Sequence, residues 1–129
     1  MPIKRLQHVS TPIPRGAEED VRDFYGRVLG LAEKPVPESL AGRGILWFEA
    51  GDGELELHFL PDAVAADPRA RRHFCLEVDD LDDYRQRLSA EGRELSEDAV
   101  IPNRPRFFCR DPFGNLLEFT TIVGDYTVS

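Results

Sequence analysis

The sequence contains little cysteine and few positive charges, and it has no long apolar run. Its two cysteines, Cys75 and Cys109, lack CxxC spacing, which excludes a disulfide framework and predicts a reducing, cytoplasmic location. The 16 lysines and arginines are outnumbered by 24 aspartates and glutamates, and the net charge of −8 argues against partners such as nucleic acid or an anionic membrane. Because no apolar run approaches the roughly 18–20 residues that cross a bilayer, we expect no membrane span.

Turn-forming residues divide the 129-residue chain into short segments with clear periodicities. Apolar residues recur at helical spacing over residues 17–29 and about 80–91, and a glycine follows each run where a C-terminal cap belongs. The strand patterns cover residues 6–13, 44–50, 54–60, 73–78, 106–110 and 116–123, with weaker patterns at 31–36 and 93–96.

The two halves of the chain repeat one order of elements. The predicted helices overlay at an offset of 60 residues, and the strings LEL at 55–57 and LEF at 117–119 overlay at an offset of 62. His8 overlays His73 at an offset of 65. Similar offsets across three elements predict a duplicated βαβββ unit.

The repeat predicts a single α+β domain over residues 1–129. Its two βαβββ modules are expected at about 1–61 and 72–124, and residues 62–71 form the linker between them. A module of this size buries little surface by itself, so we expect the chain to form a homodimer.

Four predicted strands carry an apolar face and, opposite it, histidine or glutamate side chains. These polar residues are His8, Glu56, His58, His73 and Glu118. In one interpretation, this face is the solvated side of an antiparallel sheet. In the other, a pseudo-twofold arrangement of the units brings imidazoles and carboxylates toward one axis, where they suit a borderline divalent metal.

Four stretches follow the order of motifs in one known superfamily. They are LQHV at 6–9, DFYGRVLGL at 23–31, HFCLEV at 73–78 and DPFGNLLE at 111–118. In these stretches the chain resembles the vicinal oxygen chelate superfamily, which includes glyoxalase I, fosfomycin-resistance proteins, bleomycin-resistance proteins and extradiol dioxygenases. The resemblance implies cupped mixed sheets with the helices on the outer face.

The resemblance also implies a metal centre. His8, His73 and Glu118 match the metal ligands of the superfamily, and Glu56 matches the fourth ligand of glyoxalase I. His58, two residues later on the same strand face, is the alternative fourth ligand. Glu118 is the implied catalytic base, with Glu56 as the other candidate. The implied cofactor is a divalent metal ion: Zn, Ni, Fe, Mn or Co.

Two functions follow from the resemblance. The first is that of a metal-dependent enzyme that chelates vicinal oxygens of a small-molecule substrate, either a lyase or isomerase of glyoxalase type or a dioxygenase. The second is metal-free binding and sequestration of a small molecule, as in bleomycin-resistance proteins, and the net charge of −8 fits a cationic ligand. Arg43, Arg104 and Arg106 fit either an anionic substrate or a solvated surface.

Overall fold

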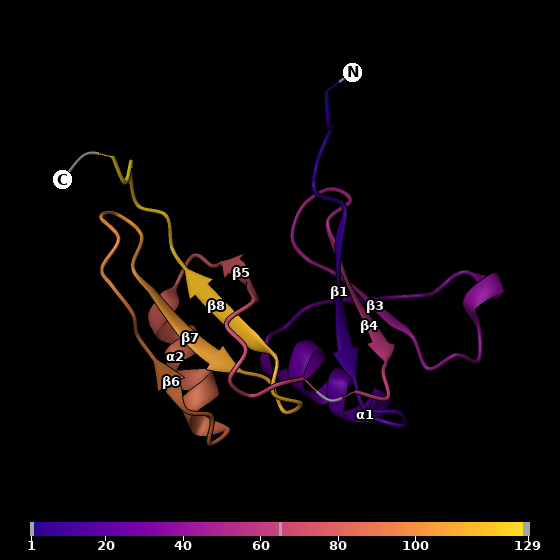
Figure 1. The fold of residues 1–129 in the computed structure, drawn as a ribbon. Coiled ribbons are helices and arrows are strands. Elements are labelled where there is room, and N and C mark those ends of the chain that lie inside the picture. Colours follow the sequence, from indigo (N-terminus) through magenta and orange to yellow (C-terminus); the bar gives the residue numbers. More distant parts are fainter. Residues whose placement is uncertain (1, 65, 128–129) are drawn as a thin grey trace. The chain divides into compact units, whose positions relative to one another are not determined.

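The computed structural model describes residues 2–64 and 66–127, and the chain divides into two compact units (Figure 1). The first unit is Met1–Ala66 and the second is Asp67–Ser129, so the boundary falls inside the segment 62–71. Among the described residues, no helix has the length and apolar character needed to cross a membrane.

The first unit is a four-stranded mixed sheet with helical segments after its first strand. Its elements are β1 (His8–Ile13), α1 (Glu18–Val21), the π-helix η1 (Arg22–Val28), β2 (Glu33–Lys34), the 3-10 helix η2 (Glu38–Leu40), β3 (Leu46–Glu49) and β4 (Glu56–Pro61). The strand order is β1-β4-β3-β2, with β1 parallel to β4 and the other pairs antiparallel. The first and last strands of the unit are therefore neighbours.

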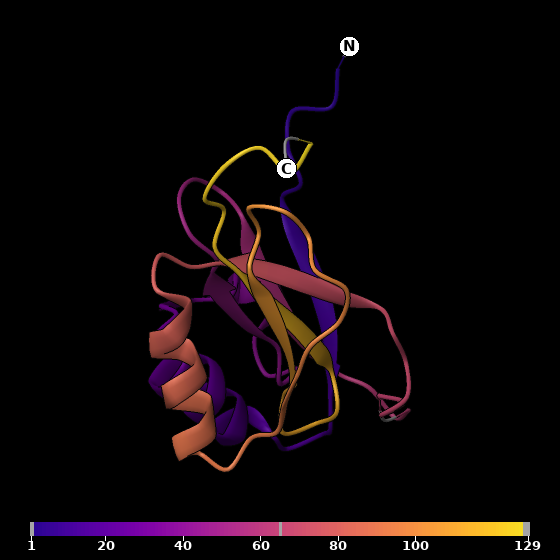
Figure 2. The same ribbon diagram turned by 90° about the vertical axis from the view of Figure 1, so that its left-hand side faces the viewer.

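The second unit has the same topology. Its elements are β5 (His73–Glu77), α2 (Leu81–Ala90), β6 (Leu95–Ser96), β7 (Arg106–Arg110) and β8 (Leu116–Thr120). The strand order is β5-β8-β7-β6, with β5 parallel to β8. Figure 2 shows α2 alongside one face of this sheet. The predicted α+β fold with two βαβββ modules is confirmed.

The strands are shorter than their sequence patterns. The first strand begins at His8 rather than at residue 6, because the ladder starts where His8 meets Glu56, and Leu6 is exposed. The last strand ends at Thr120 rather than at residue 123, and Ile122 is exposed. Apolar residues beyond the paired ladder extend a strand pattern without extending the strand.

The first helix departs from the predicted α-helix over most of its length. After α1, the backbone N–H of Leu29 donates to the carbonyl of Phe24, a spacing of five residues that defines the wider π-turn. The wider turn suits two pairs of consecutive apolar residues, and all four are buried: Phe24, Tyr25, Val28 and Leu29. The helix ends before Gly30, whose φ of 82° supports the predicted glycine stop.

The strand registers relate the last strands of the two units at an offset of 60 residues, not 62. The pairs are His8 with Glu56 and Ser10 with His58 in the first unit, and His73 with Leu116 and Cys75 with Glu118 in the second. His58 is therefore the equivalent of Glu118, and Glu56 is the equivalent of Leu116. The overlay of the LEL and LEF strings is therefore wrong by two residues. The sequence pattern could not reveal this error, because a shift of two residues keeps every side chain on the same face of its strand.

Each core is built on a buried aromatic cluster. Phe59 and Phe119, which are equivalent at the offset of 60, are both 0% exposed. The ring of Tyr25 lies 4.3 Å from that of Phe59, and the ring of Phe107 lies 5.1 Å from that of Phe119. Aromatic contacts of this kind add to the hydrophobic free energy of burial.

We expect Phe119→Ala to lower the free energy of unfolding by about 3–5 kcal/mol, because the substitution leaves a cavity among fully packed rings. Urea denaturation followed by circular dichroism measures this loss. The matched control is Val100→Ala, at a side chain that is 92% exposed, and its effect should stay within about 0.5 kcal/mol. Equal losses in the two variants would contradict the assignment of Phe119 to the core.

Candidate functional site

Three rings form a continuous stack in the first unit. The rings of His8 and His58 are 4.0 Å apart at an interplanar angle of 15°, and the rings of Trp47 and His58 are 4.2 Å apart at 5°. The strand order β1-β4-β3 explains the stack, because His58 on β4 lies between a β1 residue and a β3 residue. The position of the His58 ring is therefore held from both sides.

Glu56 is buried beside this stack and is paired with two cationic or hydrogen-bonding groups. Lys34 Nζ donates to its Oε2, and His58 Nε2 lies 2.8 Å from its Oε1. The hydrogen bonds from Lys34 and then from His58 lower the pKa of Glu56 to about 2. The carboxylate is therefore ionised at neutral pH, and its charge is neutralised locally.

Hydrogen bonds engage the Nδ1 atoms of two histidines. His8 Nδ1 lies 2.7 Å from Gln7 Oε1, while Gln7 Nε2 donates to the Glu54 carbonyl at 2.7 Å. His73 Nδ1 lies 2.8 Å from the carbonyl oxygen of Arg71. Because both partners are acceptors, each ring donates its Nδ1–H. His8 Nε2 therefore keeps a lone pair, whereas His73 Nε2 lies 2.9 Å from Glu118 Oε1, a second acceptor.

The second unit places an imidazole, a carboxylate and a guanidinium in one row. His73 Nε2 lies 2.9 Å from Glu118 Oε1, and Arg106 Nη1 lies 3.3 Å from Glu118 Oε2. The Phe108 and His73 rings meet edge to face, with their centroids 5.2 Å apart. The Arg106 guanidinium lies 5.2 Å from the centroid of the Phe108 ring. Each oxygen of Glu118 thus has its own partner.

Cys75 lies opposite Glu118 in the parallel ladder, and the charged groups around it affect the pKa of its thiol. Burial raises the pKa of its thiol to about 11, Glu118 adds to the rise, and Arg106 and Arg104 oppose it. Both guanidiniums therefore lie close to this part of β5. A thiol with such a pKa is protonated at neutral pH and is a weak nucleophile.

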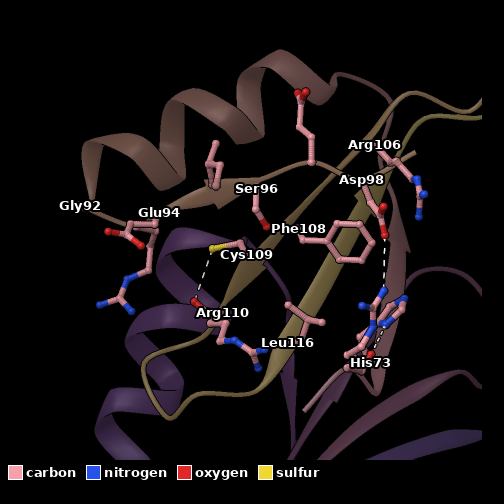
Figure 3. A pocket seen from close by; sticks show the side chains of 14 residues that line it. His73, Gly92, Glu94, Ser96, Asp98, Arg106, Phe108, Cys109, Arg110 and Leu116 are labelled. Carbon is pink, nitrogen blue, oxygen red and sulfur yellow. Dashed lines mark hydrogen bonds and ion pairs between the residues drawn. The ribbon is translucent and has the colours of Figure 1, made fainter. Parts of the chain in front are cut away.

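A cavity of about 890 Å³ opens on the second unit. Figure 3 shows His73, Phe108 and Arg106 at one end of it, and Gly92 and Glu94 at the other. This volume lies in the range of pockets that bind small molecules. The end of the pocket that holds the imidazole also holds the guanidinium that contacts Glu118.

Three of the five polar residues of the strand face are buried, so this face is not uniformly solvated. Glu56, His58 and Glu118 are 5%, 8% and 9% exposed, while His8 and His73 are exposed. The predicted site residues are brought together within each unit, as His8 with His58 and Glu56, and as His73 with Glu118. Over residues 2–64 and 66–127, no group of three or more His, Cys, Asp or Glu side chains forms a metal-binding cluster.

Three residues make contacts in the site that the sequence does not show. Lys34 falls in a weak strand pattern and reaches Glu56 from 22 residues away. Gln7 and Trp47 act through contacts that depend on strand pairing, namely the Nδ1 bond of His8 and the stack on His58. Arg106 is a sequence candidate, and its contact with Glu118 shows that it is not part of a solvated surface.

The comparisons identify the family. The sequence profile of the Glyoxalase/Bleomycin resistance protein/Dioxygenase superfamily matches residues 5–119, and the chain belongs to this superfamily. The predicted resemblance to vicinal oxygen chelate proteins is confirmed. A search of curated proteins found no match.

Solved structures share the fold along nearly the whole chain. A glyoxalase family protein from Bacillus anthracis is 36% identical, with a TM-score of 0.84, and the match covers 95% of this chain and 98% of that one. An antibiotic-binding protein from a Streptomyces species, TnmS3, is 20% identical (TM-score 0.71; coverage 95% and 98%). Lactoylglutathione lyase from Agrobacterium tumefaciens is 22% identical (TM-score 0.67; coverage 94% and 96%).

We expect Lys34→Met to raise the pKa of Glu56 from about 2 toward its ordinary value of 4.5, because the largest cause of the depression is removed. A depressed carboxyl pKa stabilises the fold above the pKa of the unfolded chain, and this contribution is lost as the pH falls toward 2. The difference in unfolding free energy between the wild type and Lys34→Met should therefore be largest above pH 4.5 and shrink toward pH 2.

Urea denaturation at several pH values measures this difference, and carboxyl NMR titration reports the pKa of Glu56 directly. Lys4→Met is the matched control, because this substitution removes the same charge from an exposed side chain. A difference that is independent of pH would contradict the ion pair between Lys34 and Glu56.

Proposed function

We propose that the protein is a metal-dependent enzyme that acts on vicinal oxygens of a small substrate. The observation that carries this proposal is the hydrogen bonding of His8 and His73. Both rings donate Nδ1–H to a fixed acceptor, which leaves Nε2 as the nitrogen of each ring that a metal ion would take; Nε2 of His73 faces Glu118 Oε1. Outer partners of this kind are typical of metal-ligating histidines.

The second unit also places two donor atoms of different kinds next to each other. His73 Nε2 and Glu118 Oε1 are 2.9 Å apart. A nitrogen donor and a carboxylate oxygen thus lie side by side, and both would hold a divalent ion. Imidazole nitrogens together with a carboxylate suit Zn, Ni, Fe, Mn or Co.

We assign the fourth ligand to His58 rather than to Glu56. His58 occupies the position in β4 that Glu118 occupies in β8, and the stack on Trp47 and His8 holds its ring. Glu56 is already engaged by Lys34 and by His58 itself. Its proposed role is to orient His58, as a carboxylate commonly does for a ligating imidazole.

Glu118 is the proposed proton acceptor of the reaction. A bound divalent ion supplies Lewis acidity to adjacent substrate oxygens. Glu118 takes a proton from the substrate carbon beside those oxygens and returns it at a neighbouring position, which is lyase or isomerase chemistry of glyoxalase type. Arg106 holds Oε2 of Glu118 and so orients the carboxylate.

Metal content tests the ligand set. Purified protein reconstituted with Zn²⁺ or Ni²⁺ should hold about one ion per set of His8, His58, His73 and Glu118. His8→Ala, His73→Ala and His58→Ala should each abolish stoichiometric binding, while Glu56→Gln should weaken affinity by about 10–100-fold, as outer partners do. Glu38→Gln, at an exposed glutamate, is the matched control for charge. Full metal content in the double variant His8→Ala/His73→Ala would overturn the assignment.

Trp47 provides an independent readout of the same titration. It is the single tryptophan of the chain and stacks on His58, so metal binding to His58 should change its fluorescence. A larger loss of affinity in Glu56→Gln than in His58→Ala would assign the fourth position to Glu56 instead.

A second candidate function is metal-free binding of a small molecule, and the cavity of about 890 Å³ favours it. TnmS3, which shares the fold, is an antibiotic-binding protein. The titration of Trp47 separates the two functions: quenching by a small molecule that is unchanged by chelator, with no metal bound, would favour sequestration.

We also propose that the protein is a homodimer, because each unit of about 60 residues has a small core of its own. Sedimentation equilibrium should give twice the chain mass of 14.6 kDa at micromolar concentration. A mass of one chain across the concentration range would contradict the dimer.

A further inference from the structure

Two arginines of the second unit have hydrogen-bonding capacity that the chain leaves unused. Within residues 2–64 and 66–127, Arg104 Nε and Arg106 Nε are the only buried side-chain nitrogen or oxygen atoms without a hydrogen-bond partner. Buried polar atoms are nearly always paired in proteins. Here two such atoms belong to cationic side chains that are two residues apart. At this place the N–H donors of the arginines outnumber the acceptors that the protein supplies.

Arg106 begins β7, and Arg104 precedes it by two residues, outside the strand. Pro105 between them favours an extended backbone, and the Thr121 N–H donates to the Pro105 carbonyl at 3.2 Å, which continues the pairing beyond β7. Residues two apart in an extended segment share a face. Phe107, on the other face, is fully buried in the core, so both arginines lie on the face that carries Glu118.

The contacts of the two guanidiniums leave donors free. Arg106 donates Nη2–H to the Ala99 carbonyl at 2.8 Å and meets Glu118 at 3.3 Å. The guanidinium of Arg104 lies 4.4 Å from the centroid of the Tyr126 ring, and no carboxylate among the described residues forms a salt bridge with it. A guanidinium presents five N–H donors in a planar fork that matches the oxygens of carboxylate and phosphate.

We propose that Arg104 and Arg106 form an oxyanion-binding subsite beside Glu118, and that the substrate carries a carboxylate or phosphate group. Identifying this ligand as the substrate rests on the proposed function, whereas the binding of the anion itself needs no metal. Arg106 lines the cavity, so the anionic group enters from the pocket shown in Figure 3. Local charge governs a contact of this kind, because the net charge of −8 is screened beyond about 8–10 Å.

The test uses full-length, ¹⁵N-labelled, metal-free protein in the presence of chelator. Inorganic phosphate and sodium acetate are titrated separately, with sodium chloride at matched ionic strength as the reference. The Nε–Hε resonances of Arg104 and Arg106, assigned from Arg104→Gln and Arg106→Gln, should shift saturably with at least one of the two anions. The anion that saturates at the lower concentration identifies the group as carboxylate or phosphate. Failure of both anions to shift either resonance overturns the subsite.

Substitutions of the two arginines test the subsite by changing the affinity for the anion. Arg104→Gln and Arg106→Gln should each weaken the affinity for the anion by about tenfold, since a charge-assisted hydrogen bond is lost. Arg69→Gln removes the same charge from a side chain that is 90% exposed, and its affinity should stay within about twofold of the wild type. Equal weakening in all three variants would show a nonspecific effect of charge and overturn the subsite.

Metal content measured on the same proteins separates this inference from the proposed function. Arg104→Gln is the informative variant, because Arg104 does not contact Glu118 in the described structure. Saturable anion shifts in a protein that binds no divalent metal support the subsite and overturn the metal-dependent function. Stoichiometric metal binding without any anion response overturns the subsite and leaves the proposed function standing.

Discussion

Parallel pairing of the first and last strands is the constraint on which each unit depends. Parallel neighbours cannot be joined by a tight turn, so the chain passes through a helical segment and two further strands before it returns. The helix covers one face of the sheet and leaves the other to polar side chains. This return brings His73 within 2.9 Å of Glu118, a residue 45 positions later in the chain.

The two units share one scaffold and differ in chemistry. Phe59 and Phe119 are equivalent core residues, whereas the equivalent of Glu118 is His58. The first unit holds stacked imidazoles beside an ion pair, and the second holds a carboxylate between an imidazole and a guanidinium. The two polar faces therefore differ in charge and in ligand type, although their strands pair in the same way.

Electrostatics in this protein is local. The chain as a whole is acidic, yet Arg106 contacts the carboxylate that the second unit buries, and Lys34 neutralises the carboxylate that the first unit buries. Burial strengthens such contacts because the surrounding protein screens charge less than water does. The composition of the whole chain therefore carried no information on the sign of charge in its pocket.

The sequence by itself determined what short-range rules control. The order of strands and helices and the glycine stop at Gly92 depend on neighbouring residues, and both appear in the structure. Only the tertiary structure decided the strand register, because a period-two pattern is unchanged by a shift of two residues. It alone revealed the equivalence of His58 with Glu118 and the pairing of Lys34 with Glu56, since both depend on which strands lie side by side.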